Sequence, residues 1–272
     1  MDITLGIDVG GSTTKIVCFK DKKCIDMLQV RAGDQITSMY GAIGNILSKN
    51  DLLPADVNAV ALTGVGASFV EKDIYGIKTL KVSEFHAIGH GALLLTGLSD
   101  ALIVSMGTGT AFVRASKDKV THLGGSGVGG GTILGLASQM IGKNDIDAII
   151  SLAEQGSLRN VDLSVKDILG KEIDTLPADL TAANFGKIKS TASESDIALG
   201  IINMVFETAG MMAVFALKDE DVRDVVITGT LATFPQAKPL LSQFEELMGL
   251  NIIIPPNTVF ATAFGANALC FQ

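Results

Sequence analysis

Short apolar runs and segments with helical apolar spacing alternate along the chain, and glycines stand at many of the junctions. Residues 3–9 and 15–19 are mostly apolar and enclose a glycine turn, which predicts two strands. Residues 35–49 place apolar side chains three and four positions apart, which predicts a helix. Two strands and a helix of small residues are expected next, at 57–63, 78–82 and 85–95.

A second series of similar elements begins near residue 101. A strand at 102–105 runs into a glycine turn at 107–110, another strand follows at 111–115, and a glycine-rich loop occupies 124–131. The pattern then predicts helices at 132–141, 145–155, 196–217 and 260–270 and strands at 224–228 and 251–254. Interleaved strands and helices are typical of an α/β fold.

The unit of strand, glycine turn and strand occurs twice, as DVGGST near the start and as MGTGTA after residue 101. This repetition predicts two related domains that face a common cleft, residues 1–98 and residues 99–272. A chain of 272 residues has room for both, since a typical domain has roughly 100–150 residues.

Composition and charge narrow the classes of function. Apolar residues make up 47% of the chain and charged residues 18%, which excludes a disordered protein. The net charge of −8 and the 5% of aromatic residues argue against a nucleic-acid-binding protein. Thirty residues are glycine without a collagen repeat, so we expect many of them to serve specific turns.

The cysteines and the apolar segments favour a cytoplasmic protein that has no membrane partner. Cys18, Cys24 and Cys270 are far apart and form no CxxC pair, which argues against a zinc ribbon and a disulfide framework. No signal-peptide pattern precedes residue 11. Residues 197–217 are long enough to span a bilayer, but Glu207 near the middle would be costly there. A core or interface helix is therefore expected.

The two glycine turns are suited to phosphate groups. Glycine turns between strands expose backbone amides that bind anions, and two such turns could hold the phosphates of one nucleotide. Asp8 at the first turn suits a carboxylate that holds Mg²⁺ indirectly, and Lys15 could neutralise phosphate charge. No Walker A motif is present, and an ordinary hairpin turn is the alternative for either loop alone.

Four strings, GIDVGGSTTK, SMGTGTAF, GGSGVGGGTILGL and LTAANFG, together resemble the type II pantothenate kinases. That family belongs to the superfamily of acetate and sugar kinases, hsc70 and actin. The resemblance covers residues 6–268 and implies two actin-like, ribonuclease H-like domains in a homodimer. It also implies phosphorylation of the primary hydroxyl of pantothenate, a small-molecule substrate, by ATP with Mg²⁺, as the first step of coenzyme A biosynthesis.

The resemblance also assigns roles to residues. It implies that Glu84 is the catalytic base, that Asp8 assists catalysis through Mg²⁺, and that the acceptor is bound by His122, Gly125 and Ser126. The residues implied to bind the nucleotide are Gly10, Gly11, Ser12, Lys15, Gly107, Thr108, Gly109, Thr110, Gly129, Gly130, Gly131, Thr132 and Gly229.

The position of Glu84 agrees with this role. It follows an expected strand directly, and the cleft of an α/β protein opens at strand ends. Phosphoryl transfer needs a carboxylate that accepts the hydroxyl proton. A glutamate that stabilises a helix N-terminus through the helix dipole is the structural alternative.

Two positions differ from the family pattern and leave other acceptors open. His122 stands where the family has an arginine that helps to hold the pantothenate carboxylate, and Ala111 stands where a serine is common. Histidine lacks the bidentate guanidinium fork, so pantetheine or another small alcohol is an alternative acceptor. Two less favoured alternatives are an ATP-dependent activator of 2-hydroxyacyl-CoA dehydratases and a non-catalytic nucleotide-binding or acyl-CoA-binding regulator.

Overall fold

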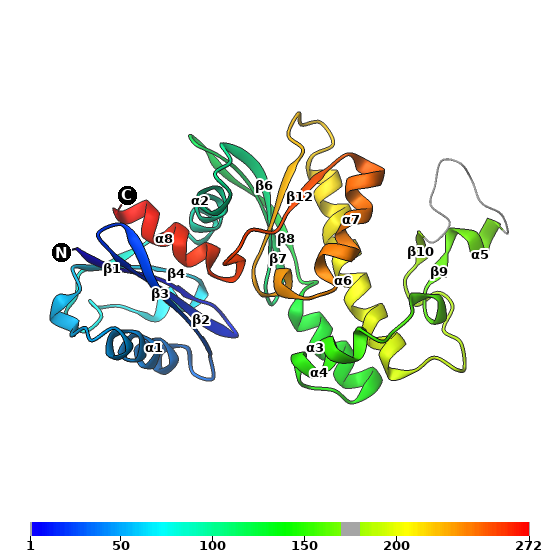
Figure 1. The fold of residues 1–272 in the computed structure, drawn as a ribbon, viewed down its shortest axis with the longest axis horizontal. Coiled ribbons are helices and arrows are strands. Elements are labelled where there is room, and N and C mark those ends of the chain that lie inside the picture. The colour runs from blue at the N-terminus through cyan, green and yellow to red at the C-terminus, as the bar shows by residue number, and fades with distance from the viewer. Residues whose placement is uncertain (1, 170–179, 272) are drawn as a thin grey trace.

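The computed structural model describes residues 2–169 and 180–271. Two five-stranded sheets form the centres of the two halves of the molecule, and their helices pack on them (Figure 1). The strands are β1 Ile3–Val9, β2 Thr13–Lys20, β3 Lys23–Arg31, β4 Ala59–Thr63, β5 Thr79–Lys81, β6 Asp100–Met106, β7 Thr110–Ser116, β8 Val120–Ser126, β9 Leu163–Ser164, β10 Thr181–Ala183, β11 Asp224–Thr228 and β12 Asn251–Ile253. The helices are α1 Gln35–Lys49, α2 Glu84–Thr96, α3 Gly130–Ile141, α4 Ile146–Ala153, α5 Val165–Leu169, α6 Glu194–Ala216, α7 Ala237–Met248 and α8 Ala261–Phe271.

The two large sheets have the same topology. The N-terminal sheet has the order β3-β2-β1-β4-β5, and the C-terminal sheet has the corresponding order β8-β7-β6-β11-β12. In each sheet the first strand pairs antiparallel with the second and parallel with the fourth. The α/β class and the repeated unit of strand, turn and strand are thereby confirmed.

In the N-terminal sheet, β1 has a different helix on each of its faces. Ile3, Leu5 and Ile7 are fully buried and pack in one cluster with apolar side chains of α1. The intervening residues face α8, and Gly6 lies so close that a Cβ atom there would be 2.2 Å from the Ala263 carbonyl oxygen. Asp8 belongs to this second row, so the alternation of β1 directs its carboxylate to the α8 face.

The C-terminal sheet also packs on both faces. Leu102 and Val104 of β6 share the largest core cluster with the buried side of α6, including Phe206. Ile103 of β6 and Val113 of β7 point to the other face and pack against α2. The face that carries α2 is therefore distinct from the face that carries α6.

Helices α2 and α8 lie next to each other between the two sheets, with α8 in red in Figure 1. Their contact is made by glycines: a Cβ atom on Gly91 would be 1.8 Å from the Ala261 carbonyl oxygen, and one on Gly265 would be 1.9 Å from that of Ala87. Any side chain at these glycines would push the helices apart. The boundary expected near residue 98 falls between α2 and β6, and the division into domains 1–98 and 99–272 stays a prediction.

Helix α6 agrees with the expected core helix. Of the chain that the structure describes, it is the one helix long and apolar enough to cross a membrane, and 56% of its apolar window is buried inside the protein. Ile201, Ile202, Val205 and Phe206 are fully buried in the largest core cluster. These contacts account for the apolar character of the buried side of the segment.

The sequence pattern missed three of the longer elements. Strand β3, strand β8 and helix α7 were not expected. The prediction of a loop over 124–131 was wrong at its start, because β8 continues to Ser126 and only then gives way to the start of α3. His122, Gly125 and Ser126 are consequently residues of an edge strand.

Candidate functional site

The first glycine turn joins β1 to β2 and has an ion pair at its base. Asp8 lies opposite Lys15 in the strand register, and the lysine Nζ is 3.3 Å from the Asp8 Oδ2. Only 9% of the Asp8 side chain and 12% of the Lys15 side chain are exposed. Burial raises the pKa of Asp8, and the neighbouring lysine opposes this shift. A carboxylate and a cation that are both shielded from solvent therefore lie side by side at the base of this turn.

The backbone of this first turn has amides available for an anion. The amide of Gly10 donates to the Thr13 carbonyl oxygen at 3.0 Å. Of the partners that the structure describes, none accepts from the amides of Gly11 and Ser12. A Cβ atom at Gly10 would be 2.9 Å from the Thr13 oxygen, so glycine is required there. Two consecutive amides of this kind can bind a phosphate oxygen.

The second glycine turn joins β6 to β7 and touches the first. Gly107 donates its amide to the Gly109 carbonyl oxygen at 2.9 Å, which closes the turn. The Oγ1 of Thr108 is 3.0 Å from the Oγ of Ser12, so a hydroxyl–hydroxyl contact connects the two turns. The hydroxyl of Thr110 is buried and donates to the Val128 carbonyl oxygen at 2.8 Å. The structure thus brings both predicted phosphate loops together.

The glycines at the start of α3 support the second turn. The amide of Gly130 donates to the Gly107 carbonyl oxygen at 2.8 Å, and the amide of Gly131 donates to that of Thr108 at 2.9 Å. The Gly129 amide donates to the Thr132 hydroxyl at 3.1 Å. These amides are already used inside the protein, so these glycines hold the second turn in place.

Gly229 and Gly64 form matching turns at the ends of β11 and β4. Gly229 has a φ of +91° and Gly64 a φ of +88°. A Cβ atom would be 2.4 Å from the Met106 carbonyl oxygen at Gly229 and 2.6 Å from that of Val9 at Gly64. Gly64 also approaches Asp8, whose Oδ1 would be 2.5 Å from such a Cβ atom.

Sequence reasoning missed Gly64 as part of the site. The signal was present, because LTGVGASF at residues 62–69 and ITGTLATF at residues 227–234 share the pattern of an aliphatic residue, Thr-Gly, two variable residues, Ala, Ser or Thr, and Phe. Both segments run from a strand through the glycine into a short 3-10 helix.

Glu84 is the first residue of α2 and lies close enough to Asp8 and Lys15 to be affected by their charges. Burial raises the pKa of Glu84, the Asp8 carboxylate raises it further, and Lys15 opposes the shift. A carboxylate with a raised pKa is a stronger proton acceptor. Glu84 can therefore take a proton from a hydroxyl group that enters beside the two turns.

The three residues predicted to bind the acceptor share strand β8. Gly125 pairs with Ala111 and Ser126 pairs with Thr110 on β7. His122 is exposed, and its ring is stacked on Phe85 with centroids 3.7 Å apart and an angle of 10° between the planes. The stack connects β8 with the residue that follows Glu84.

Small residues form the sheet surface beside this stack. Ser105, Ala111 and Gly125 are neighbours across β6, β7 and β8. Strand alternation places this row on the face that packs against α2, next to the row of Val113 and His122. All three are at least partly accessible to solvent. This surface of small residues lies on the same sheet face as the start of α2.

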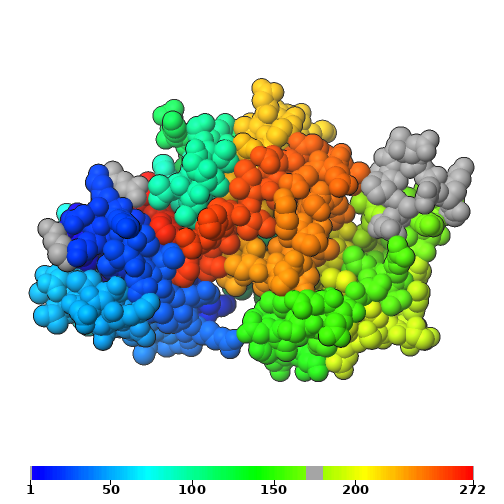
Figure 2. Space-filling view, viewed as in Figure 1, coloured from blue at the N-terminus to red at the C-terminus, as the bar shows by residue number. Residues whose placement is uncertain are grey.

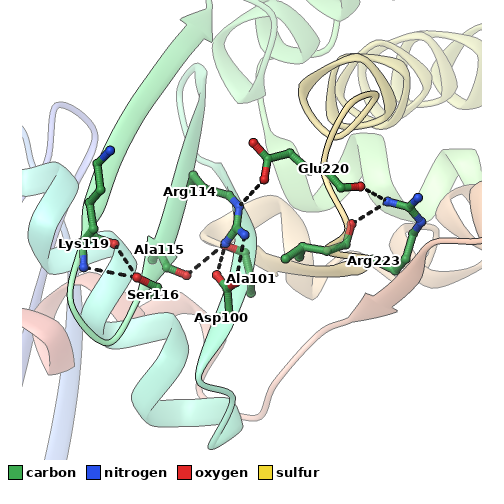
Figure 3. A network of polar contacts seen from close by, with 9 residues as sticks. Asp100, Ala101, Arg114, Ala115, Ser116, Lys119, Glu220 and Arg223 are labelled. Atoms are coloured by element: carbon green, nitrogen blue, oxygen red, sulfur yellow. Dashed lines mark hydrogen bonds and ion pairs between the residues drawn. The ribbon is translucent and has the colours of Figure 1, made fainter.

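Arg114 does not replace the arginine that the family pattern has at position 122. Figure 3 shows its guanidinium directed to Asp100 and to the carbonyl oxygens of Ala101 and Ala115. The Arg114 Nη2 is 2.9 Å from Asp100 Oδ2, and Glu220 lies 3.8 Å away. This pairing lowers the pKa of Asp100. Alternation on β7 places Arg114 on the sheet face opposite to Val113, away from the stack.

The donor set at the first turn is suited to Mg²⁺ bound together with phosphates. Mg²⁺ in such sites is held by one or two carboxylates, phosphate oxygens and water. Asp8 supplies one carboxylate next to the free amides of the turn. The part of the chain that the structure describes contains no group of three His, Cys, Asp or Glu residues that could hold a metal ion without such a ligand.

The three cysteines are free thiols, and Cys24 lies near enough to Cys18 to affect its pKa. Cys18 is buried in β2, where burial raises its pKa to about 11, and Cys270 is part of α8. Cys24 is half-buried at the start of β3. A thiol kept protonated by burial is a poor metal ligand.

Comparisons with known proteins show the family of the chain. Residues 97–238, more than half of the chain, match the model of the family described as Fumble. A type II pantothenate kinase of Bacillus cereus is 27% identical over 276 aligned residues, which cover 98% of each chain. The resemblance to type II pantothenate kinases is confirmed by these matches.

Solved structures share the fold at low sequence identity. The activator of the 2-hydroxyisocaproyl-CoA dehydratase from Clostridium difficile, with bound ADPNP, has a TM-score of 0.71 at 17% identity and covers 99% of this chain and 94% of its own. A ROK family glucokinase from Streptomyces griseus, in complex with glucose and AMPPNP, has a TM-score of 0.62 at 15% identity, with 98% of each chain covered. These likenesses confirm the two-part nucleotide-binding fold.

Proposed function

Because the chain belongs to the Fumble family, we propose that it is an ATP-dependent kinase that phosphorylates the primary hydroxyl of pantothenate, the first step of coenzyme A biosynthesis. The kinase activity is supported by the family match over more than half of the chain and by the full-length similarity to a type II pantothenate kinase. The observation that carries the chemistry is the grouping of Asp8, Lys15 and Glu84 beside two touching glycine turns.

ATP is the phosphoryl donor in this reaction. Its phosphates bind to the turns 10–12 and 107–110, where free amides and Lys15 offset their charge. Asp8 would hold Mg²⁺ indirectly, and the cation would neutralise charge on the phosphates. Gly229 lies at the end of β11, where the nucleoside would be accommodated, and the acceptor would lie over Gly125 and Ser126, beside the stack of His122 on Phe85.

Glu84 serves as the general base. Its carboxylate accepts the proton of the acceptor hydroxyl while the oxygen forms a bond to the γ-phosphorus, and the bond from that phosphorus to ADP breaks. The raised pKa of Glu84 improves its ability to accept that proton. The products are ADP and the phosphorylated alcohol.

The Glu84→Gln substitution tests this role. Loss of a general base costs roughly 100- to 10,000-fold in rate, so we expect turnover to fall by that factor while an ATP analogue still binds. ADP release in the presence of pantothenate measures the rate, and calorimetry measures nucleotide binding. Glu154→Gln, an exposed glutamate at the end of α4, is the matched control. Full turnover by Glu84→Gln would remove it from the base role.

The acceptor is tested in the same assay with pantothenate, pantetheine and common sugars. Transfer to pantothenate supports the assignment. Transfer to another alcohol, with none to pantothenate, would overturn the acceptor and leave the kinase chemistry intact.

The remaining assignments concern assembly and location. One side of α6 carries the half-buried Met204 and Met211 and the exposed Phe215, of which 68% is accessible. We propose that this stripe contributes to a homodimer, which sedimentation velocity would detect as twice the chain mass. We also propose a cytoplasmic location, which cell fractionation tests. The two domains, residues 1–98 and 99–272, are proposed to close on ATP, and small-angle X-ray scattering with and without nucleotide tests this closure.

A further inference from the structure

No polar partner within residues 2–169 and 180–271 fixes the position of the Glu84 carboxylate. Among the residues that the structure describes, none donates a hydrogen bond to it or forms an ion pair with it. The preceding residue, Ser83, makes no side-chain capping bond to α2. The location of the carboxylate therefore depends on how the first turn of α2 is packed.

The first turn of α2 is held against β8 by Phe85 and His122. The two rings are nearly parallel, with centroids 3.7 Å apart. Further along the same pair of elements, a Cβ atom on Gly89 would be 3.0 Å from Val120 of β8. Of these two contacts between α2 and β8, the stack of Phe85 on His122 is the one nearer to Glu84 in the sequence.

A β-bulge controls the direction of His122. Val113 pairs with His122 and Phe112 pairs with Gly124, so Leu123 has no partner on β7. Gly124 has a φ of +150°, a conformation that favours glycine. Bulges turn the neighbouring side chains of an edge strand, and here the residue that precedes the bulge is the one stacked on Phe85.

We propose that His122 is a positioning residue: its stack on Phe85 aligns the carboxylate of Glu84. On this proposal His122 does not bind the acceptor directly. This inference rests on the proposed role of Glu84 as the base. A shift of about 1 Å in a reacting group can cost roughly 100-fold in rate, so a planar contact one residue from the base can control turnover.

Steady-state kinetics of His122→Ala and His122→Phe test the inference. We expect His122→Ala to lower kcat roughly 10- to 100-fold, with the acceptor KM and the affinity for an ATP analogue changed less than about twofold. His122→Phe retains a flat ring and is expected to recover most of the lost kcat. Thr121→Ala, on the opposite face of β8, is the matched control and should behave as the wild type.

Direct acceptor binding by His122 predicts a different result. In that case both substitutions raise the acceptor KM, kcat is preserved, and phenylalanine is no better than alanine. Either a change confined to KM or the failure of His122→Phe to recover kcat would overturn the positioning role.

A double-mutant cycle in urea unfolding examines the stack without any substrate. Phe85→Leu and His122→Ala are expected to be non-additive in the free energy of unfolding, because each removes the same contact. Additive effects would show that the stack does not couple α2 to β8 and would overturn the inference. If the stack is coupled but the wild type transfers no phosphate to any acceptor, the proposed function fails, and the role of His122 in alignment fails with it.

Discussion

The turn after β1 and the turn after β6 occupy equivalent places in sheets of the same order, but only the first has charged residues at its base. Asp8 lies opposite Lys15 on β2 and opposite Thr63 on β4. The equivalent residue of the second sheet, Ser105, lies opposite Ala111 and Thr228. At the second turn the side chains that face α2 are therefore small and uncharged, namely Ser105 and Ala111.

The backbones of the two halves remain much closer than these side chains. Gly64 and Gly229 follow the equivalent strands β4 and β11 with φ angles of +88° and +91°. Each closes over the end of the first strand of its sheet, at Val9 or at Met106. The repeated backbone therefore supplies two similar turns, and the side chains at two equivalent positions, Asp8 and Lys15 against Ser105 and Ala111, make the first turn a charged site and the second a neutral one.

The largest expected effect comes from the two equivalent positions Asp8 and Ser105. Asp8→Asn should lower kcat/KM for ATP by about 100-fold or more, because a shielded charge beside the phosphates is lost. Ser105→Ala should change it less than about threefold. Kinetics at several ATP concentrations measure both, and thermal unfolding shows whether the variants are folded. Equal losses would mean that the two turns share the same chemistry.

The equivalent glycines should behave alike in stability. Gly64→Ala and Gly229→Ala each force a side chain into a positive φ and against a carbonyl oxygen, so each should lower the free energy of unfolding by about 1–3 kcal/mol. Urea denaturation measures both values. Gly11→Ala, where a Cβ atom has no neighbour within 4 Å, is the control with a smaller expected loss. A clear loss at one glycine alone would contradict the equivalence of the backbones.

The smallest effect is a shift of the pH profile. Glu84 must be ionised to accept a proton, so activity is present above its raised pKa and is lost as the pH falls through it. The acid limb of kcat/KM should lie above the ordinary glutamate value of about 4.5. Lys15→Met should move it higher, since Lys15 lowers this pKa.

Arg114→Met is the matched change in the second half and should leave the acid limb in place, because Arg114 lies on the far face of its sheet and is paired with Asp100. An acid limb at or below the ordinary glutamate value, or one that moves equally in both variants, would show that local burial and charge at the first turn do not control Glu84.

The two glycine turns could be predicted from the sequence because glycine between two apolar runs is a local signal of a tight turn. Strands β1 and β6 could be predicted because each is a short run of mostly apolar residues. Strand β3 was missed because it is an edge strand without a fully buried side chain, so its apolar pattern is weak. In β8 the glycines and the bulge concealed a strand. Helix α7 did carry a signal, since Ala237, Leu241 and Phe244 are buried at helical spacing.

Side-chain neighbours across the sheets could not be predicted in this way. The stack of Phe85 on His122 depends on the bulge at Leu123, and the closeness of Glu84 to Asp8 and Lys15 depends on how α2 packs between the sheets. Neither is encoded in the spacing of nearby residues. The proximity of Ser12 to Thr108 likewise depends on how the two sheets are joined.

The packing of α2 and α8 has a consequence for the order in which the protein can fold during synthesis. Helix α2 follows the last strand of the N-terminal sheet but packs on the C-terminal sheet, and α8 follows the last strand of the C-terminal sheet but packs on β1 and β2 (Figure 2, red atoms against blue). The α8 face of β1 stays uncovered until the ribosome has translated α8. We therefore expect the nascent N-terminal half to be a client of chaperones until translation reaches α8.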